Sequence, residues 1–170
     1  MKKLIYVLFV FTFIVFTACE GPQGPPGPPG FDGQNGVNIV AQSFERTVDF
    51  LPSNNYEQFI VIPESIELFE TDMVLTYILW EIDPNTGNDV WRLIPQTVYT
   101  DAGQEWQYNS DYSFDEVRVF IDAPLNFDFN SLPDAATLDQ RFKIVVLPVD
   151  LMNSYDLDIT NFNQVSQYIE

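Results

Sequence analysis

Short runs of alternating hydrophobic and polar residues follow one another after residue 39, a pattern typical of β-strands. In the first run Val40, Phe44, Val48 and Phe50 fall on one side of an extended segment. The same pattern predicts strands over 59–62, 73–82, 89–99, 104–108, 116–122 and 141–149. This number of short strands indicates an all-β domain and favours a β-sandwich, of which the jelly roll is one form.

The segment 73–82 is hydrophobic on both faces. Its two sets of alternate side chains are Val74, Ile78 and Trp80 on one face and Leu75, Tyr77 and Leu79 on the other. This pattern predicts a central strand that is covered on both sides. The next six residues, 83–88, are rich in turn-forming side chains, so 73–82 and 89–99 are predicted to form a hairpin.

Helix is expected in only two places. Thr160 is a candidate cap for a short C-terminal helix, with Phe162, Val165 and Ile169 on its buried face. A further helical turn is predicted within 131–140.

The N-terminus has a different pattern, typical of a secretory signal. Two lysines precede an apolar run, 4–16, and small residues follow it. The roughly 15 residues from 4 to 18 span about 22 Å as a helix, less than the roughly 30 Å of a bilayer core. Residues 1–18 are therefore predicted to be a cleaved signal peptide.

The tetrapeptide Phe16-Thr17-Ala18-Cys19 resembles the lipobox of bacterial lipoproteins. That resemblance implies that Cys19, the single cysteine of the chain, becomes the first mature residue and carries the lipid. Two or three acyl chains would hold the protein stably in a membrane, at about 0.8 kcal/mol for each buried CH₂.

Glycine occupies every third position directly after Cys19. The repeating glycines are Gly21, Gly24, Gly27, Gly30, Gly33 and Gly36. With proline between them, they form a collagen-like tether over 19–36, which is either a trimeric triple-helical stalk or a polyproline spacer on a monomer. The shortness of the tract favours the spacer, which would be about 50 Å long at ~3.1 Å per residue. A homotrimer remains the alternative.

The charge balance limits the partners. The chain has 25 acidic and 7 basic residues, and its net charge is −18. Nucleic-acid binding requires clustered lysine and arginine, so this class of partner is not expected. Docking on anionic lipid is disfavoured for the same reason, and the membrane contact is assigned to the lipid anchor.

The available side chains exclude most catalytic chemistry. With no histidine and a single cysteine, the chain can form no Ser-His-Asp or Cys-His site and no zinc site of His and Cys ligands. It also has no phosphate-binding glycine motif. A pair of carboxylates, as in glycosidases, is the remaining option. We therefore expect no cofactor and a protein that is not an enzyme.

Two further groups of residues are candidate binding sites. Asp83, Asn85 and Asp89 alternate as calcium ligands do, but the position of Gly87 departs from the EF-hand loop, and a hairpin turn is favoured. Trp106 and Tyr108 share one face of a strand. That face is either part of the core, which we favour, or an exposed platform that stacks on a ligand.

Residues 1–36, with the stretches 77–81 and 89–97, resemble the collagen-like repeat lipoproteins of the Bacteroidetes group. The resemblance implies three parts: signal peptide 1–18, lipidated tether 19–36 and β-domain 37–170. The expected function is that of a lipid-anchored cell-envelope protein, in the outer membrane of a Gram-negative bacterium, which presents an acidic β-sandwich for binding or assembly. The partner would be a protein or a glycan. The alternatives are a carbohydrate-active enzyme with paired carboxylates and a structural trimer.

Overall fold

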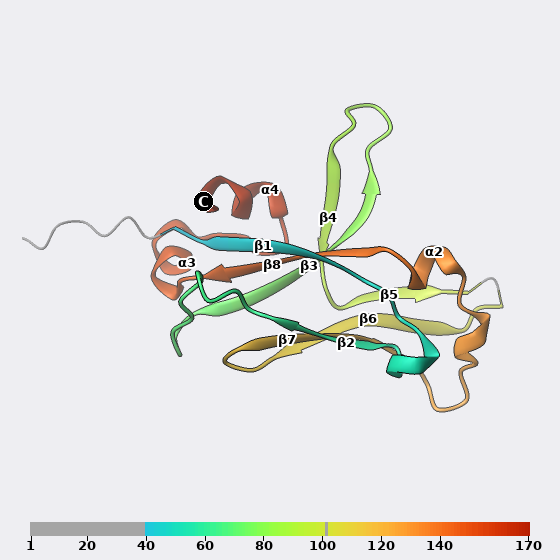
Figure 1. The fold of residues 1–170 in the computed structure, drawn as a ribbon. Helices are drawn as coiled ribbons and strands as arrows, with labels where there is room; N and C mark the ends of the chain where they lie inside the picture. The colour runs from blue at the N-terminus through green and yellow to red at the C-terminus, as the bar shows by residue number, and fades with distance from the viewer. Residues whose placement is uncertain (1–39, 101) are drawn as a thin grey trace, which may run out of the picture. The chain divides into compact units, whose positions relative to one another are not determined.

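Two four-stranded antiparallel sheets face each other in this protein, which confirms the predicted β-sandwich (Figure 1). The computed structural model describes residues 40–100 and 102–170. The strand order is β1-β8-β3-β4 in the first sheet and β2-β7-β6-β5 in the second. The strands are β1 Gln42–Val48, β2 Glu57–Val61, β3 Met73–Ile82, β4 Asp89–Leu93, β5 Gln96–Tyr99, β6 Glu105–Tyr112, β7 Glu116–Asp122 and β8 Gln140–Leu147.

Strands distant in the sequence pair in both sheets. β1 pairs with β8, and β2 pairs with β7, the kind of long-range pairing that a jelly roll uses. Local pairs complete the sheets, β3 with β4 in the first and β5 with β6 and β6 with β7 in the second. β3 pairs with β8 on one side and β4 on the other, so it is an interior strand, as its two-sided hydrophobicity predicts.

The prediction of a single strand over 89–99 is wrong. Two strands, β4 and β5, occupy this stretch and belong to different sheets. The chain leaves the first sheet at Ile94 and Pro95, and proline has no N–H group to continue a strand ladder. The predicted hairpin of 73–82 with the first part of this stretch, β4, is confirmed.

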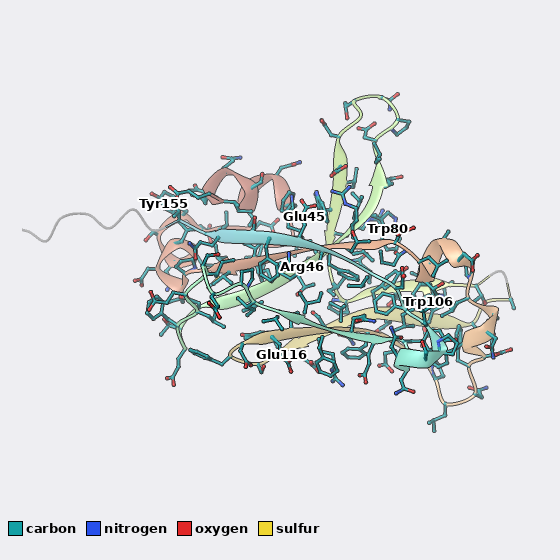
Figure 2. The ribbon with its side chains drawn as sticks, viewed as in Figure 1. Glu45, Arg46, Trp80, Trp106, Glu116 and Tyr155 are labelled. Atoms are coloured by element: carbon teal, nitrogen blue, oxygen red, sulfur yellow. The ribbon has the colours of Figure 1, made fainter. Side chains whose placement is uncertain are left out.

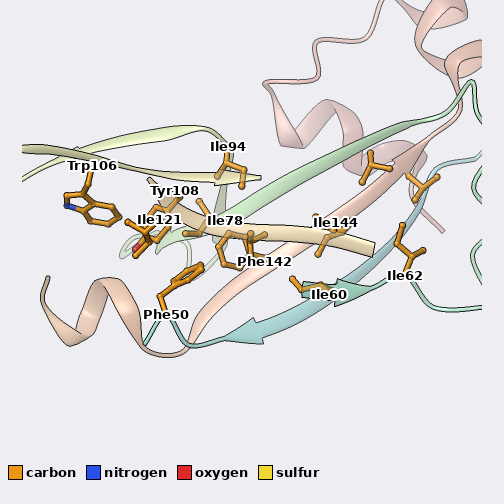
Figure 3. Close-up of a cluster of buried hydrophobic side chains, with 14 of the residues drawn as sticks. Phe50, Ile60, Ile62, Ile78, Ile94, Trp106, Tyr108, Ile121, Phe142 and Ile144 are labelled. Carbon is orange, nitrogen blue, oxygen red and sulfur yellow. The ribbon is translucent and has the colours of Figure 1, made fainter. Parts of the chain in front are cut away.

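The main core lies between the two sheets. On β7, Val117, Val119 and Ile121 all point inward and are 0%, 0% and 6% exposed, as their alternation predicts. Figure 3 shows part of this cluster, with Phe50 and Phe142 among the side chains of both sheets. The rings of Phe50 and Phe142 pack edge to face with their centroids 6.0 Å apart.

A second core covers the outer face of the first sheet. Tyr77 and Trp91 of that face pack against the C-terminal helices, α3 (Val149–Tyr155) and α4 (Phe162–Val165). The Tyr77 hydroxyl donates a hydrogen bond to the Ile159 carbonyl at 2.6 Å. The segment that follows β8 is therefore an integral part of the fold.

The helices agree in part with the sequence prediction. The turn predicted within 131–140 is α2 (Asp134–Thr137). α4 lies at the predicted place, with Phe162, Val165 and Ile169 in the second core, but its cap is Asn161, whose side chain accepts a hydrogen bond from the Asn163 N–H at 3.1 Å. α3 is absent from the prediction, because the strand expected over 141–149 ends at Leu147 and Pro148 precedes the helix.

The two ends of the described domain are joined by backbone hydrogen bonds. The Ala41 N–H donates to the Tyr168 carbonyl at 2.8 Å, and the Glu170 N–H donates to the Ala41 carbonyl at 3.0 Å. Residues 37–170 form one compact unit that contains both cores, so this unit holds the contacts needed to fold by itself.

The predicted signal peptide, Cys19 and the glycine repeat lie outside the described residues. Within the part of the chain that the structure describes, no helix has the length and hydrophobicity needed to cross a membrane.

Candidate functional site

The two aromatic residues singled out from the sequence, Trp106 and Tyr108, point into the core from β6. They are 3% and 4% exposed, and their rings pack edge to face at 4.8 Å. The Tyr108 hydroxyl donates to the Ala136 carbonyl at 2.7 Å and lies 3.1 Å from Oε1 of Gln140. They therefore form no exposed stacking platform, but they line a cavity.

This aromatic cavity has a volume of about 220 Å³ and lies beside α2. Its lining is Ile78, Leu79, Trp80, Val98, Trp106, Tyr108, Pro133, Ala135, Ala136 and Gln140. Nine of these ten side chains are hydrophobic or aromatic, and the amide of Gln140 already donates to the carbonyls of Ala135 and Leu138 at 3.0 and 2.7 Å. The cavity is thus suited to an apolar group.

Trp80 lies at the edge of this cavity because β3 is irregular at that point. Leu79 is paired with Trp91 and Glu81 with Val90, so Trp80 has no partner in the ladder. Such a β-bulge re-aims a side chain and is common beside binding sites. Trp80 is half-buried, and Figure 2 shows it at the base of the β3–β4 hairpin.

Arg92 stacks on Trp80. The central carbon of its guanidinium is 4.2 Å from the centroid of the indole ring. The side chain is exposed and forms no hydrogen bond or ion pair with residues 40–100 or 102–170. A cationic group with free donors therefore lies against the tryptophan that borders the cavity.

The cations on the two sheets' outer faces are, in contrast, held by carboxylates. Arg118 forms an ion pair with Glu57 at 3.3 Å and a two-point contact with Asp111. The hydrogen bond from Arg118 is the main cause that holds the pKa of the Asp111 carboxyl below its ordinary value.

Glu45 joins two other cations. Its carboxylate lies 2.9 Å from Arg141 and 3.1 Å from Lys143, and Lys143 stacks on Trp91 at 4.4 Å. Partial burial would raise the pKa of Glu45, but the hydrogen bonds and charges of Arg141 and Lys143 outweigh it and lower that pKa. This cluster ties β1 to β8.

The loop of the β3–β4 hairpin has the geometry of a turn. Oδ1 of Asp83 accepts a hydrogen bond from the Asn85 N–H at 2.8 Å, which is the main cause of a lowered pKa at Asp83. Gly87 adopts a φ of +72°, a conformation that favours glycine. Asp89 points instead to Arg141, 3.5 Å away. Among the described residues no three His, Cys, Asp or Glu side chains are grouped to hold a metal ion.

Two larger hollows have walls of mixed polar and apolar character. One, of about 470 Å³, lies between the hairpin and α4 and includes Asn88 and Asn163 in its wall. The other, of about 460 Å³, lies beside Val40 and includes Glu67, Asp72 and Asp150. The first of these also contains Asp83 and Asp89, which serve the hairpin turn and the contact with Arg141, and the second contains none of the residues predicted as binding sites.

Sequence reasoning missed the contribution of Arg92, Gln140 and α2 to this site. No local signal could have found them, because the bulge at Trp80 and the approach of α2 to β6 arise from tertiary packing.

In comparisons with known proteins, no family model, no curated protein and no solved structure matches this chain.

Proposed function

We propose that this protein is a non-enzymatic lipoprotein of the bacterial cell envelope, in the outer membrane of a Gram-negative cell. Cys19 carries the lipid, the glycine repeat is the tether, and the acidic β-sandwich is the part that binds a partner. The lipobox tetrapeptide and the strict glycine period support the first two assignments. They are the features shared with collagen-like repeat lipoproteins.

The observation that supports the binding role is that the chain enters the domain at one end and the aromatic cavity lies at the other. The chain enters the sandwich at Ala41, next to the Leu147 end of β8, whereas the aromatic cavity lies at the Gln140 end. β1 runs from one end to the other, a distance of about 20 Å at 3.3–3.4 Å per residue. Figure 1 likewise places α2, which borders the cavity, far from α3. A tether at Ala41 would thus leave the cavity on the far side of the domain.

Replacement of the anchoring residue tests this function. Cys19→Ser should abolish incorporation of a labelled fatty acid and leave the precursor uncleaved at this site, because the thiol is the acceptor of the lipid. Thr17→Ser is the matched control, since it keeps both the cysteine and a small residue before it. Labelling and membrane fractionation of cells that produce each full-length variant provide the measurement. Label retained in Cys19→Ser would contradict the lipoprotein assignment.

A further inference from the structure

We propose that the aromatic cavity binds a small aromatic carboxylate, with the ring in the cavity and the carboxylate on Arg92. The inference deepens the proposed binding role of the sandwich and rests on it. It combines three observations: the size and lining of the cavity, the free donors of Arg92, and the position of Trp80 between them.

The size and chemistry of the cavity fit one ring. The aromatic cavity has a volume of about 220 Å³ and is open to solvent on one side, so it has room for a single ring while the rest of a ligand extends outward. A sugar would need several hydrogen-bonding groups around it. Here Gln140 and the Tyr108 hydroxyl are already engaged with neighbouring groups, so an apolar ring suits the lining better than a polyol.

The position of Arg92 supplies the charge preference. A guanidinium that stacks on an aromatic ring keeps its N–H donors in its own plane, where they can bind a carboxylate at two points. In Arg118 the corresponding N–H donors are already occupied, because they contact the carboxylates of Asp111 and Glu57. Within the described residues Arg92 has no carboxylate partner, and it stacks on a ring that lines the aromatic cavity, which makes it the candidate anion site.

Trp80 links the two parts of the site. Its ring lines the cavity, and the guanidinium of Arg92 lies 4.2 Å from the centre of the same ring. A ligand would therefore need a linker that joins a ring in the cavity to a carboxylate on Arg92. 4-Phenylbutyrate has this shape and serves as the probe, and 4-phenylbutyramide is its neutral counterpart.

Calorimetric titration of residues 37–170 with 4-phenylbutyrate tests the proposal. We expect saturable binding with a dissociation constant below about 1 mM, which is reasonable for a ligand of this size. Arg92→Gln should weaken binding of the acid about tenfold or more, because a charge-assisted hydrogen bond is lost. The amide should bind wild type and Arg92→Gln equally.

Two further variants locate the site. Arg46→Gln is the matched control, because Arg46 also stacks on a ring, that of Phe44 at 5.1 Å, but Phe44, unlike Trp80, does not line the cavity. It should leave binding unchanged. Ala135 is exposed at the cavity wall, so Ala135→Phe can fill the cavity without disturbing the core, and it should abolish binding of both acid and amide. Near-ultraviolet circular dichroism checks that each variant is folded.

Several results would overturn the proposal. They are the absence of saturable binding by folded wild type, equal affinity for acid and amide, equal losses in Arg92→Gln and Arg46→Gln, and undiminished binding by Ala135→Phe. The titration does not depend on the lipid anchor, so its failure is distinct from the outcome of the Cys19→Ser labelling.

Discussion

Removal of the Tyr77 hydroxyl should measure how strongly the C-terminal segment is attached to the first sheet. Tyr77 is fully buried, and its hydroxyl donates to the Ile159 carbonyl at 2.6 Å. Tyr77→Phe keeps the ring and its packing against Phe162, so only the hydrogen bond is lost. A net hydrogen bond is worth about 0.5–1.5 kcal/mol, and a buried acceptor left unpaired costs about 1–3 kcal/mol. Because Ile159 is only half-buried, water can replace part of this bond, and we expect a loss of about 1–2 kcal/mol.

Urea unfolding of residues 37–170 provides the assay. For an m-value of about 2 kcal/mol/M, this loss lowers the midpoint by about 0.5–1 M without a change in m. Amide exchange should also rise from Asn161 to Val165 and remain unchanged in β6 and β7, because the lost bond lies in the C-terminal segment.

Tyr99→Phe is the matched control for this experiment. Tyr99 is 67% exposed, so its change should stay within about 0.5 kcal/mol. Equal stability losses in Tyr77→Phe and Tyr99→Phe would refute the reasoning. Accelerated exchange throughout both sheets would do so too, since it would mean that the bond supports the whole domain.

Three further predictions follow from the buried tyrosines, the hairpin loop and the tether. Burial raises the pKa of Tyr77, with a further contribution from the charge of Asp158, and burial also raises the pKa of Tyr108. Above a pH of about 10 these tyrosines lose their protons in the unfolded chain but keep them in the folded one. The free energy of unfolding should therefore fall by about 1.4 kcal/mol per pH unit for each tyrosine. Urea unfolding of Tyr108→Phe should show a pH dependence smaller by the contribution of one tyrosine. Asp83→Ala should leave the calorimetric response to calcium unchanged, since Asp83 serves the turn; a dissociation constant below about 10⁻⁵ M that this change abolished would contradict us. Gly27→Ala in residues 20–170 should not alter the sedimentation mass if the tether is a spacer, whereas loss of a wild-type trimer would establish the triple helix.

Much of the sandwich could be predicted because alternation records which face of a strand is buried. β7 is the clearest case, with its three inward side chains at every second position. The division of 89–99 was harder to predict, because Trp91 and Val98 both look like strand residues and both are at least partly buried. Only Pro95 indicates that the chain passes from one strand to another here. A proline within a single edge strand would give the same sequence pattern, so it does not decide between the two cases.

The candidate site was predictable only in part. The shared face of Trp106 and Tyr108 can be recognised in the sequence. What lies opposite them depends on the packing of the first sheet and α2 against β6. The role of Trp80 depends on a shift of one residue in the β3–β4 register, which the sequence does not mark. Arg92 pairs with Ile78 in the regular part of the ladder, and the shift concerns the ring of Trp80 on which Arg92 stacks, so this contact follows from strand pairing and not from any motif.

The distribution of the cations explains how an acidic domain can still hold an anion site. Arg118, Arg141 and Lys143 are each engaged by carboxylates on the sheet faces, and Arg46 donates to the Glu45 carbonyl at 2.7 Å. Arg92 is stacked on Trp80 instead, where the ring stabilises the cation without consuming its in-plane donors. The Debye length is about 8 Å at physiological ionic strength, so distant acids are largely screened and the local guanidinium decides the sign of the charge that binds. It follows that affinity for the acid should rise as salt is raised from very low concentration, because screening weakens the long-range repulsion before it weakens the close contact with Arg92.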